Sequence, residues 1–210
     1  MKRNKQIDFA VLILVLLASC SAPIRNDIAV FRRDIPVSKY GEPDLFYSLA
    51  QQKAKQLKLD SLQNGFDSLQ IRIWYDYSLI GLRQLVIIKR AQKAWTATCY
   101  MLEVEWDSDM RTEEIKKQTR ILLSPKSGWD DFLKQLFGLQ TVTLPNMNDI
   151  PGLVDGWTDG TTYSVEVATM QQYRFYYYHL PVKFQDKFWQ ARDMVEILKL
   201  VKSELGIEYE

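Results

Sequence analysis

Apolar and polar residues recur with two different periods along most of the chain. Between Pro43 and Leu62 the apolar residues follow helical spacing, and the pair Asn64-Gly65 ends the pattern, which predicts a helix. From residue 69 onward the period becomes two, as in half-buried β-strands. The pattern predicts six strands, over residues 69–77, 84–88, 94–106, 115–123, 162–168 and 173–180, with a short helix as the alternative for residues 115–123.

Two further helices are predicted, over residues 128–138 and 186–205, and each is bounded by a glycine at its C-terminal end. The stretch 144–160 is rich in proline, glycine, asparagine and aspartate and is expected to be a long loop. Successive strands with short links favour antiparallel pairing, and no β–α–β alternation is present. We therefore expect an α+β fold: a mainly antiparallel sheet of about six strands with an N-terminal helix, a short middle helix and a C-terminal helix, forming a single domain over residues 43–210.

The first residues have a different pattern, a basic lead followed by an unbroken apolar run. Lys2, Arg3 and Lys5 precede the nine apolar residues Phe9–Leu17. As a helix this run would be about 13 Å long, whereas the hydrocarbon core of a bilayer is about 30 Å thick. The segment is too short to span a membrane and is typical of a secretion signal.

The run ends in Leu17-Ala18-Ser19-Cys20, which is similar to the lipobox of bacterial lipoprotein signals at all four positions. The resemblance implies a signal peptide over residues 1–19, cleavage between Ser19 and Cys20, and a thioether-linked diacylglycerol on the Cys20 sulfur. Two or more acyl chains anchor a protein stably, so the implied partner is a membrane. The alternatives are an ordinary cleaved signal or an uncleaved anchor.

Residues 20–42 contain Pro23, Pro36 and Gly41 among polar residues and are expected to be a lipidated tether. Ser21 follows the cysteine in place of the aspartate that retains some lipoproteins at the inner membrane. The lipoprotein resemblance therefore implies the cell envelope, at the outer membrane and facing the periplasm.

Charge and cysteine content narrow the class further. Cleavage after residue 19 removes three of the 27 basic and one of the 26 acidic residues, leaving 24 and 25, a net charge of about −1. A near-neutral domain without a basic run does not have the charge pattern of a nucleic-acid binder. With Cys20 lipidated, Cys99 is the only other cysteine and has no disulfide partner in the chain. His179 is the only histidine, and no metal or cofactor motif is present.

The predicted long loop and the strand after it hold the carboxylates most suggestive of a site. Asp149, Asp155 and Asp159 could supply oxygen ligands to calcium, but their spacing lacks the periodicity of a calcium loop and is typical of ordinary turns. Asp159 and Glu166 could form the carboxylate pair of a hydrolase. Glu166 lies between two valines on its strand, so it is expected to face solvent or a groove if the valines face the core.

The strand over residues 173–180 carries aromatic side chains on both faces. Arg174, Tyr176 and Tyr178 share one face, and Phe175 and Tyr177 share the other. If one set packs under a helix, the set with the arginine could line a groove for a sugar, a peptide or a partner protein. The alternative is burial of both sets.

The order of Ile71-Arg72-Ile73-Trp74, the Gly128-Trp129 helix, the segment 159–166 and the strand from Tyr173 resembles uncharacterised small exported proteins of Bacteroidetes-type bacteria. This resemblance implies a location and brings no activity with it. We expect a membrane-anchored envelope lipoprotein whose domain binds a protein or a glycan. The alternatives are an envelope hydrolase with a carboxylate pair and a structural subunit of an outer-membrane assembly.

Overall fold

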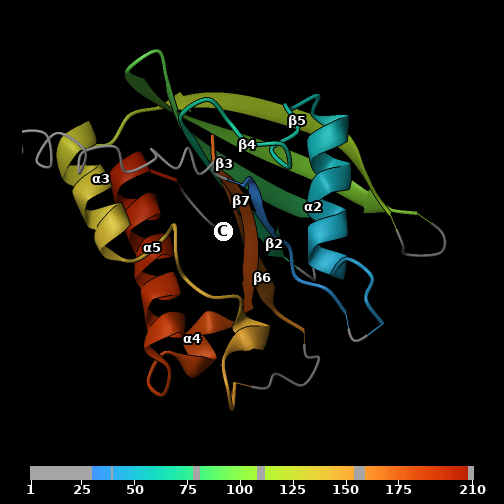
Figure 1. Cartoon of the computed structure of the whole chain (residues 1–210). Coiled ribbons are helices and arrows are strands. Elements are labelled where there is room, and N and C mark those ends of the chain that lie inside the picture. The colour runs from blue at the N-terminus through green and yellow to red at the C-terminus, as the bar shows by residue number, and fades with distance from the viewer. Residues whose placement is uncertain (1–29, 39, 78–80, 108–111, 154–158, 208–210) are drawn as a thin grey trace, which may run out of the picture. The chain divides into compact units, whose positions relative to one another are not determined.

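A computed structural model describes residues 30–38, 40–77, 81–107, 112–153 and 159–207. The signal peptide, Cys20 and Asp155 lie outside the described residues. Residues 31–210 form one compact unit. Its elements, labelled as in Figure 1, are β1 (Arg32–Asp34), α2 (Leu45–Gln56), β2 (Leu69–Tyr77), β3 (Leu82–Ala91), β4 (Ala94–Trp106), β5 (Glu113–Leu123), α3 (Trp129–Gly138), the 3-10 turn η1 (Met147–Asp149), β6 (Thr161–Thr169), β7 (Gln172–His179), α4 (Pro181–Phe184) and α5 (Trp189–Leu205).

The strands form one sheet in the order β1-β7-β6-β2-β3-β4-β5. Strands β2 to β5 are a meander of antiparallel neighbours, and the tight turn between β3 and β4 places Gln92 and Lys93 at positive φ, as a type I′ hairpin requires. The chain then passes through α3 and η1 and returns as β6, which pairs with β2 instead of β5. The predicted α+β class is confirmed. The order of the strands in the sheet differs from their order in the chain, because β6 lies beside β2 and β5 is at the edge.

The sheet has seven strands, where about six were expected, and it is mixed: five of its six strand pairs are antiparallel, as expected, and one is parallel. The additional strand is β1, which pairs in parallel with β7 through the register Arg32 to Gln172. It lies within residues 20–42, the stretch predicted to be a tether. The expectation of a tether is therefore wrong for these three residues, which belong to the folded unit.

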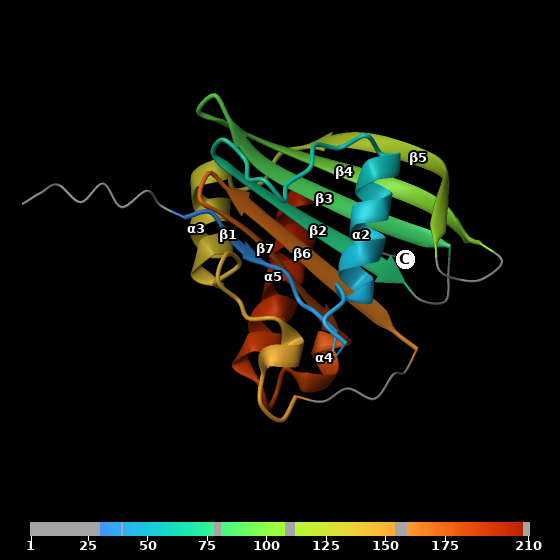
Figure 2. The same ribbon diagram turned by 45° about the vertical axis from the view of Figure 1, so that its right-hand side comes forward.

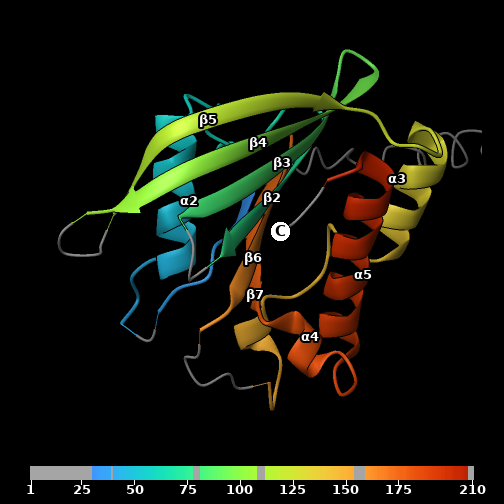
Figure 3. The ribbon, with the colours of Figure 1, turned by 180° about the vertical axis from the view of Figure 1, so that it is seen from behind.

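Helices cover both faces of the sheet. Figure 1 shows α2 on one face and α3, α4 and α5 on the other, and Figures 2 and 3 show the same division from two further directions. The C-terminal helix buries a stripe that includes Met194, Ile197 and Val201, and it ends at Gly206 in the left-handed conformation, as predicted. The helix expected over 186–205 is α5, which begins three residues later than predicted and ends at the predicted residue, and the short helix α4 precedes it in the chain.

Coverage of both faces changes the meaning of the alternation in β2. Ile71 and Ile73 point to the α5 face, and Arg72, Trp74 and Asp76 point to the α2 face, since successive side chains alternate. Residues 70–75 are nevertheless all buried. The polar positions of this strand therefore mark a second, polar buried layer beneath α2, not a solvent-facing side.

Within the described residues, no helix is long and apolar enough to cross a membrane.

Candidate functional site

A pocket with a volume of ≈ 520 Å³ opens between the N-terminal part of α2 and one end of the sheet. At this end β2, β4 and β7 finish and β3, β5 and β6 begin, so residues far apart in the sequence meet there. The pocket is lined by Asp44, Leu45, Phe46, Leu49, Lys53, Asp76, Arg83, Trp106, Glu113, Met147, Asn148, Asp159, Gly160, Thr162, Tyr177 and His179. Its size falls in the range of ordinary small-ligand sites.

Helical spacing positions the α2 side of the pocket. Leu45, Leu49 and Lys53 follow one another at intervals of four residues, so they lie along one face of the helix. Leu45 is about half exposed at the mouth, whereas Lys53 is fully buried. A buried lysine is costly unless its charge is paired.

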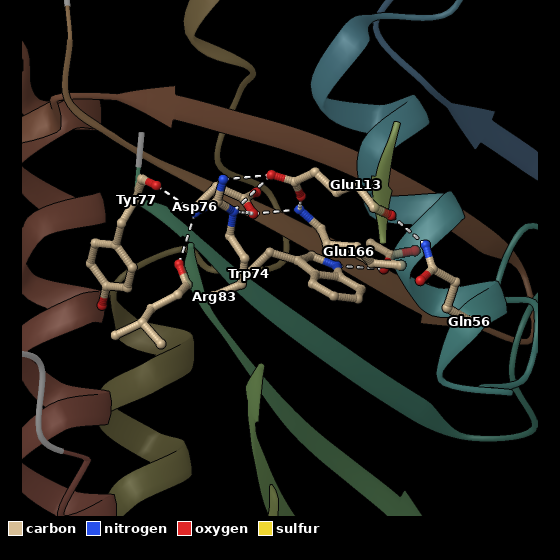
Figure 4. Close-up of polar contacts among 9 residues, drawn as sticks. Gln56, Trp74, Asp76, Tyr77, Arg83, Glu113 and Glu166 are labelled. Carbon is tan, nitrogen blue, oxygen red and sulfur yellow. Dashed lines mark hydrogen bonds and ion pairs between the residues drawn. The ribbon is translucent and has the colours of Figure 1, made fainter. Parts of the chain in front are cut away.

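The pairing is a closed ring of four alternating charges, which we call the ion quartet: Lys53, Asp76, Arg83 and Glu113. Figure 4 labels Asp76, Arg83 and Glu113 of this ring. The Lys53 ammonium contacts Asp76 and lies 3.1 Å from Glu113 Oε2. Arg83 Nε lies 3.3 Å from Asp76 Oδ1 and donates to Glu113 Oε1 at 3.0 Å. Each cation therefore contacts both carboxylates, and the four formal charges cancel.

Backbone contacts fix the ion quartet at the junction of α2, β2, β3 and β5. The Arg83 guanidinium also donates to the carbonyl oxygens of Tyr77 and Leu82. Gln56 at the end of α2 donates to the Glu113 carbonyl at 2.6 Å and accepts from Ile115 N at 2.8 Å, which ties the helix to β5. Burial alone would raise the pKa of Glu113, but the charges of Lys53 and Arg83 and their hydrogen bonds outweigh it and lower this pKa.

The other end of the pocket is aromatic. The rings of Phe46 and Tyr177 lie 4.7 Å apart at 53°. The Tyr177 hydroxyl accepts a hydrogen bond from Asn148 Nδ2 at 2.7 Å and donates one to Asp44 Oδ2 at 3.4 Å. Asp44 is the N-cap of α2, since its Oδ1 accepts from Phe46 N at 2.8 Å. Burial raises the pKa of Asp44 despite these hydrogen bonds.

The start of β6 and the end of β7 close the pocket between these two ends. Thr162 Oγ1 and His179 Nδ1 are hydrogen-bonded at 2.8 Å. Asp159 is exposed and lines the pocket beside Gly160. At Gly160 a Cβ atom would lie 2.4 Å from Leu180 Cδ2, so any side chain at this position would require the Leu180 side chain to move.

Glu166 lies elsewhere, in a second polar cluster under α2. Its carboxylate accepts hydrogen bonds from Trp74 Nε1 at 2.9 Å, from the Tyr173 hydroxyl at 2.8 Å and from Gln51 Nε2 at 2.9 Å, and Arg72 NH1 is 3.7 Å away. Glu166 is 0% exposed and does not line the pocket. The expectation that it faces solvent or a groove is wrong, because α2 covers the face of the sheet to which it points. The structure therefore brings Asp159 to the pocket and leaves Glu166 out of it.

The arginine and tyrosine face of β7 is also closed. Tyr176 and Tyr178 are buried, and their hydroxyls donate to the carbonyl oxygens of Thr141 and Pro145, both at 2.8 Å. Arg174 donates to Asp34 and to two carbonyl oxygens of the segment before η1. These side chains hold the 141–145 segment against the sheet. The groove proposed for this face is not formed, and both aromatic sets of β7 are buried.

The ion quartet is the part of the site that sequence reasoning missed. A usable signal was present in α2, where Lys53 occupies the same helical stripe as Leu45 and Leu49. A lysine at a core position indicates a buried counter-charge, but nothing local identifies Asp76, Arg83 or Glu113 as its partners.

No cluster of metal-ligating side chains occurs among the residues that the structure describes. Comparisons with protein-family models, with curated proteins and with solved structures find no match for this chain.

Proposed function

We propose that this chain is a lipid-anchored envelope protein whose folded domain binds a group of an envelope peptide or glycan in the pocket beside α2. The observation that carries the binding proposal is the pocket itself, which combines ring faces, hydrogen-bonding groups and a charge-compensated wall. Such a mixture of mostly apolar surface and a few placed polar groups is typical of ligand sites. The ion quartet contributes rigidity, since each of its charges has two counter-charges on separate elements.

The sequence supports the anchoring part of the proposal through the lipobox-like motif that ends at Cys20. A protein held this way would have its domain near the membrane surface, in reach of cell-wall polymers and of other envelope proteins. The proposed location is the outer membrane, with the domain facing the periplasm.

Metabolic labelling tests the anchor. Cells that express the full chain are fed labelled palmitate, and the protein is compared with its Cys20→Ser variant. We expect label and membrane association in the parent and neither in the variant. An unlabelled parent, or a variant that stays equally membrane-bound, would contradict the anchor.

Binding is tested with the mature lipidated protein in detergent micelles. Soluble glycan and peptide fragments released from the cell envelope are screened by NMR line broadening, and the binding fraction is then titrated calorimetrically. Asn148→Trp places a large ring at an exposed pocket position and should abolish binding. Val182→Trp is the matched control, because Val182 is exposed on α4 and does not line the pocket. Equal binding by both variants would refute the pocket as the site.

The hydrolase alternative loses its support from the pair Asp159 and Glu166. A general acid or base must come within hydrogen-bond distance of the reacting group. Glu166 is fully buried and already accepts three hydrogen bonds, so a substrate in the pocket cannot reach it.

A further inference from the structure

The charges that line the pocket do not balance once the ion quartet has been accounted for. Among the lining residues that the structure describes, Lys53 and Arg83 are the only lysine and arginine, and both are matched by Asp76 and Glu113. Two further carboxylates, Asp44 and Asp159, line the same pocket, and the other described lining residues add no formal charge when His179 is counted as neutral. The described wall therefore carries an excess of two negative charges.

The N-terminus of α2 reduces this excess without reversing it. A helix N-terminus acts as roughly half a positive charge, and Asp44 caps it through the hydrogen bond to Phe46 N. The cap therefore keeps about half of its negative charge, and Asp159 keeps the whole of its own. An anionic ligand would have to overcome both carboxylates, because neither Lys53 nor Arg83 is available without breaking the ion quartet.

Aromatic rings share the pocket with these two carboxylates, and Tyr177 contacts Asp44 directly. Phe46 and Tyr177 pack next to Asp44, and Trp106 is 39% exposed at the pocket. Ring faces attract ammonium groups, and more strongly when water is displaced. Burial raises the pKa of Asp44 by desolvating its carboxylate, and its hydrogen bonds offset only part of this effect.

We propose that the ligand of this pocket carries a primary ammonium group, held by Asp44 and Asp159 beside the aromatic rings. The inference rests on the proposed function and specifies the chemistry of its ligand. A free amino group of an amino sugar and the side-chain amine of a peptide both provide this chemistry, and they differ in what surrounds the charge.

The test uses two matched pairs of probes with the mature protein in detergent micelles. One pair is a trimer of glucosamine and the corresponding trimer of N-acetylglucosamine. The other is an N-terminally acetylated glycyl-lysyl-glycine amide and the same peptide acetylated on its lysine. In at least one pair the ammonium probe should bind about tenfold more tightly than its acetylated partner, and added salt should reduce that difference. The pair that shows the difference identifies the source of the amine.

Charge-removing variants locate the effect. Asp159→Asn and Asp44→Asn should each weaken binding of the ammonium probe about fivefold, and asparagine keeps the N-cap of α2. Asp67→Asn is the matched control, since Asp67 is exposed and precedes β2 at the end opposite Asp76, and it should leave binding unchanged.

Three results would overturn the inference: neither ammonium probe binds, the acetylated probes bind equally well, or both pocket variants bind like the parent. If acetylated probes bind and Asn148→Trp abolishes that binding, the pocket function stands and only the charge assignment fails. If the envelope fragments also fail to bind, the proposed function fails with it.

Discussion

Removal of the lysine from the ion quartet is the sharpest perturbation of the site. In Lys53→Met the side chain keeps an unbranched apolar stem, is one atom shorter than that of lysine and loses the charge. Asp76 and Glu113, whose side chains are 13% and 2% exposed, then share Arg83 as the one remaining cation of the quartet. The variant therefore leaves an uncompensated negative charge beneath α2.

The distances set the size of the effect. At the 3.1 Å separation of Lys53 and Glu113, the Coulomb attraction between the two charges is about 5 kcal/mol for an effective dielectric constant of about 20. Part of this attraction only offsets the free-energy cost of removing the two ions from water. Removal of one partner from a buried ion pair costs about 3–5 kcal/mol. We expect the lower end of this range, about 3 kcal/mol of unfolding free energy, because Asp76 retains some contact with water.

The assay is urea unfolding at pH 7, followed by tryptophan fluorescence, on the mature chain carrying Cys20→Ser. The double variant Lys53→Met/Glu113→Gln restores the charge balance, since Asp76 and Arg83 remain as a pair. It should be more stable than the sum of the two single effects predicts, by about 1 kcal/mol or more. Additive losses, or a loss below about 1 kcal/mol for Lys53→Met, would refute the ion quartet as a coupled unit.

Three further predictions concern single titratable groups. The folded state lowers the pKa of Glu113 below its ordinary 4.5, so the stabilising contribution of this carboxylate is complete above pH 4.5 and is lost as the pH falls through the folded pKa. The difference in unfolding free energy between the parent and Glu113→Gln should therefore shrink below pH 4.5. A difference that does not depend on pH would contradict this. Burial raises the pKa of Asp44, so the contribution of Asp44 to stability falls as the pH rises through its folded pKa. In urea unfolding at pH 7, Asp44→Asn should be no less stable than the parent, because asparagine also caps the helix. Asp44→Ala should lose about 1 kcal/mol of capping energy. Burial raises the pKa of the Cys99 thiol to about 11. A thiol reagent at pH 8 should therefore label the native Cys20→Ser protein slowly and the urea-unfolded protein at once. Equal labelling rates would show that the Cys99 thiol is accessible in the folded protein.

Local signals in the sequence were sufficient for most of the elements. The bounds of β2 and β4 were predicted to the residue, β2 from the alternation of its side chains and β4 from its content of β-branched and aromatic residues after the turn at Gln92 and Lys93. β1 could not be predicted in this way. It has only three residues, Arg32–Asp34, with no apolar alternation, and its pairing depends on β7, some 140 positions later in the chain.

Long-range order explains the errors at the site. Alternation around Glu166 correctly separates it from its valine neighbours, but alternation does not say which element covers the opposite face. α2 covers it, and the carboxylate becomes a buried acceptor for Trp74 and Tyr173 instead of a solvent-facing group. The same cover encloses the polar face of β2 and creates the pocket at its end.

The ion quartet shows what sequence reasoning could still recover about such a site. A charged residue on a buried stripe has a large desolvation cost, and a stable fold must supply its counter-charge from somewhere in the chain. The helical pattern alone identifies Lys53 as a charged residue on a buried stripe. Its partners Asp76, Arg83 and Glu113 lie near strand ends, where charged residues are common and do not indicate a buried ion pair. They become partners only because β2, β3 and β5 present their ends to α2 together. In the proposed function these four charges form a neutral wall of the pocket, and the proposed selectivity for an ammonium group then rests on Asp44 and Asp159, which the wall does not neutralise.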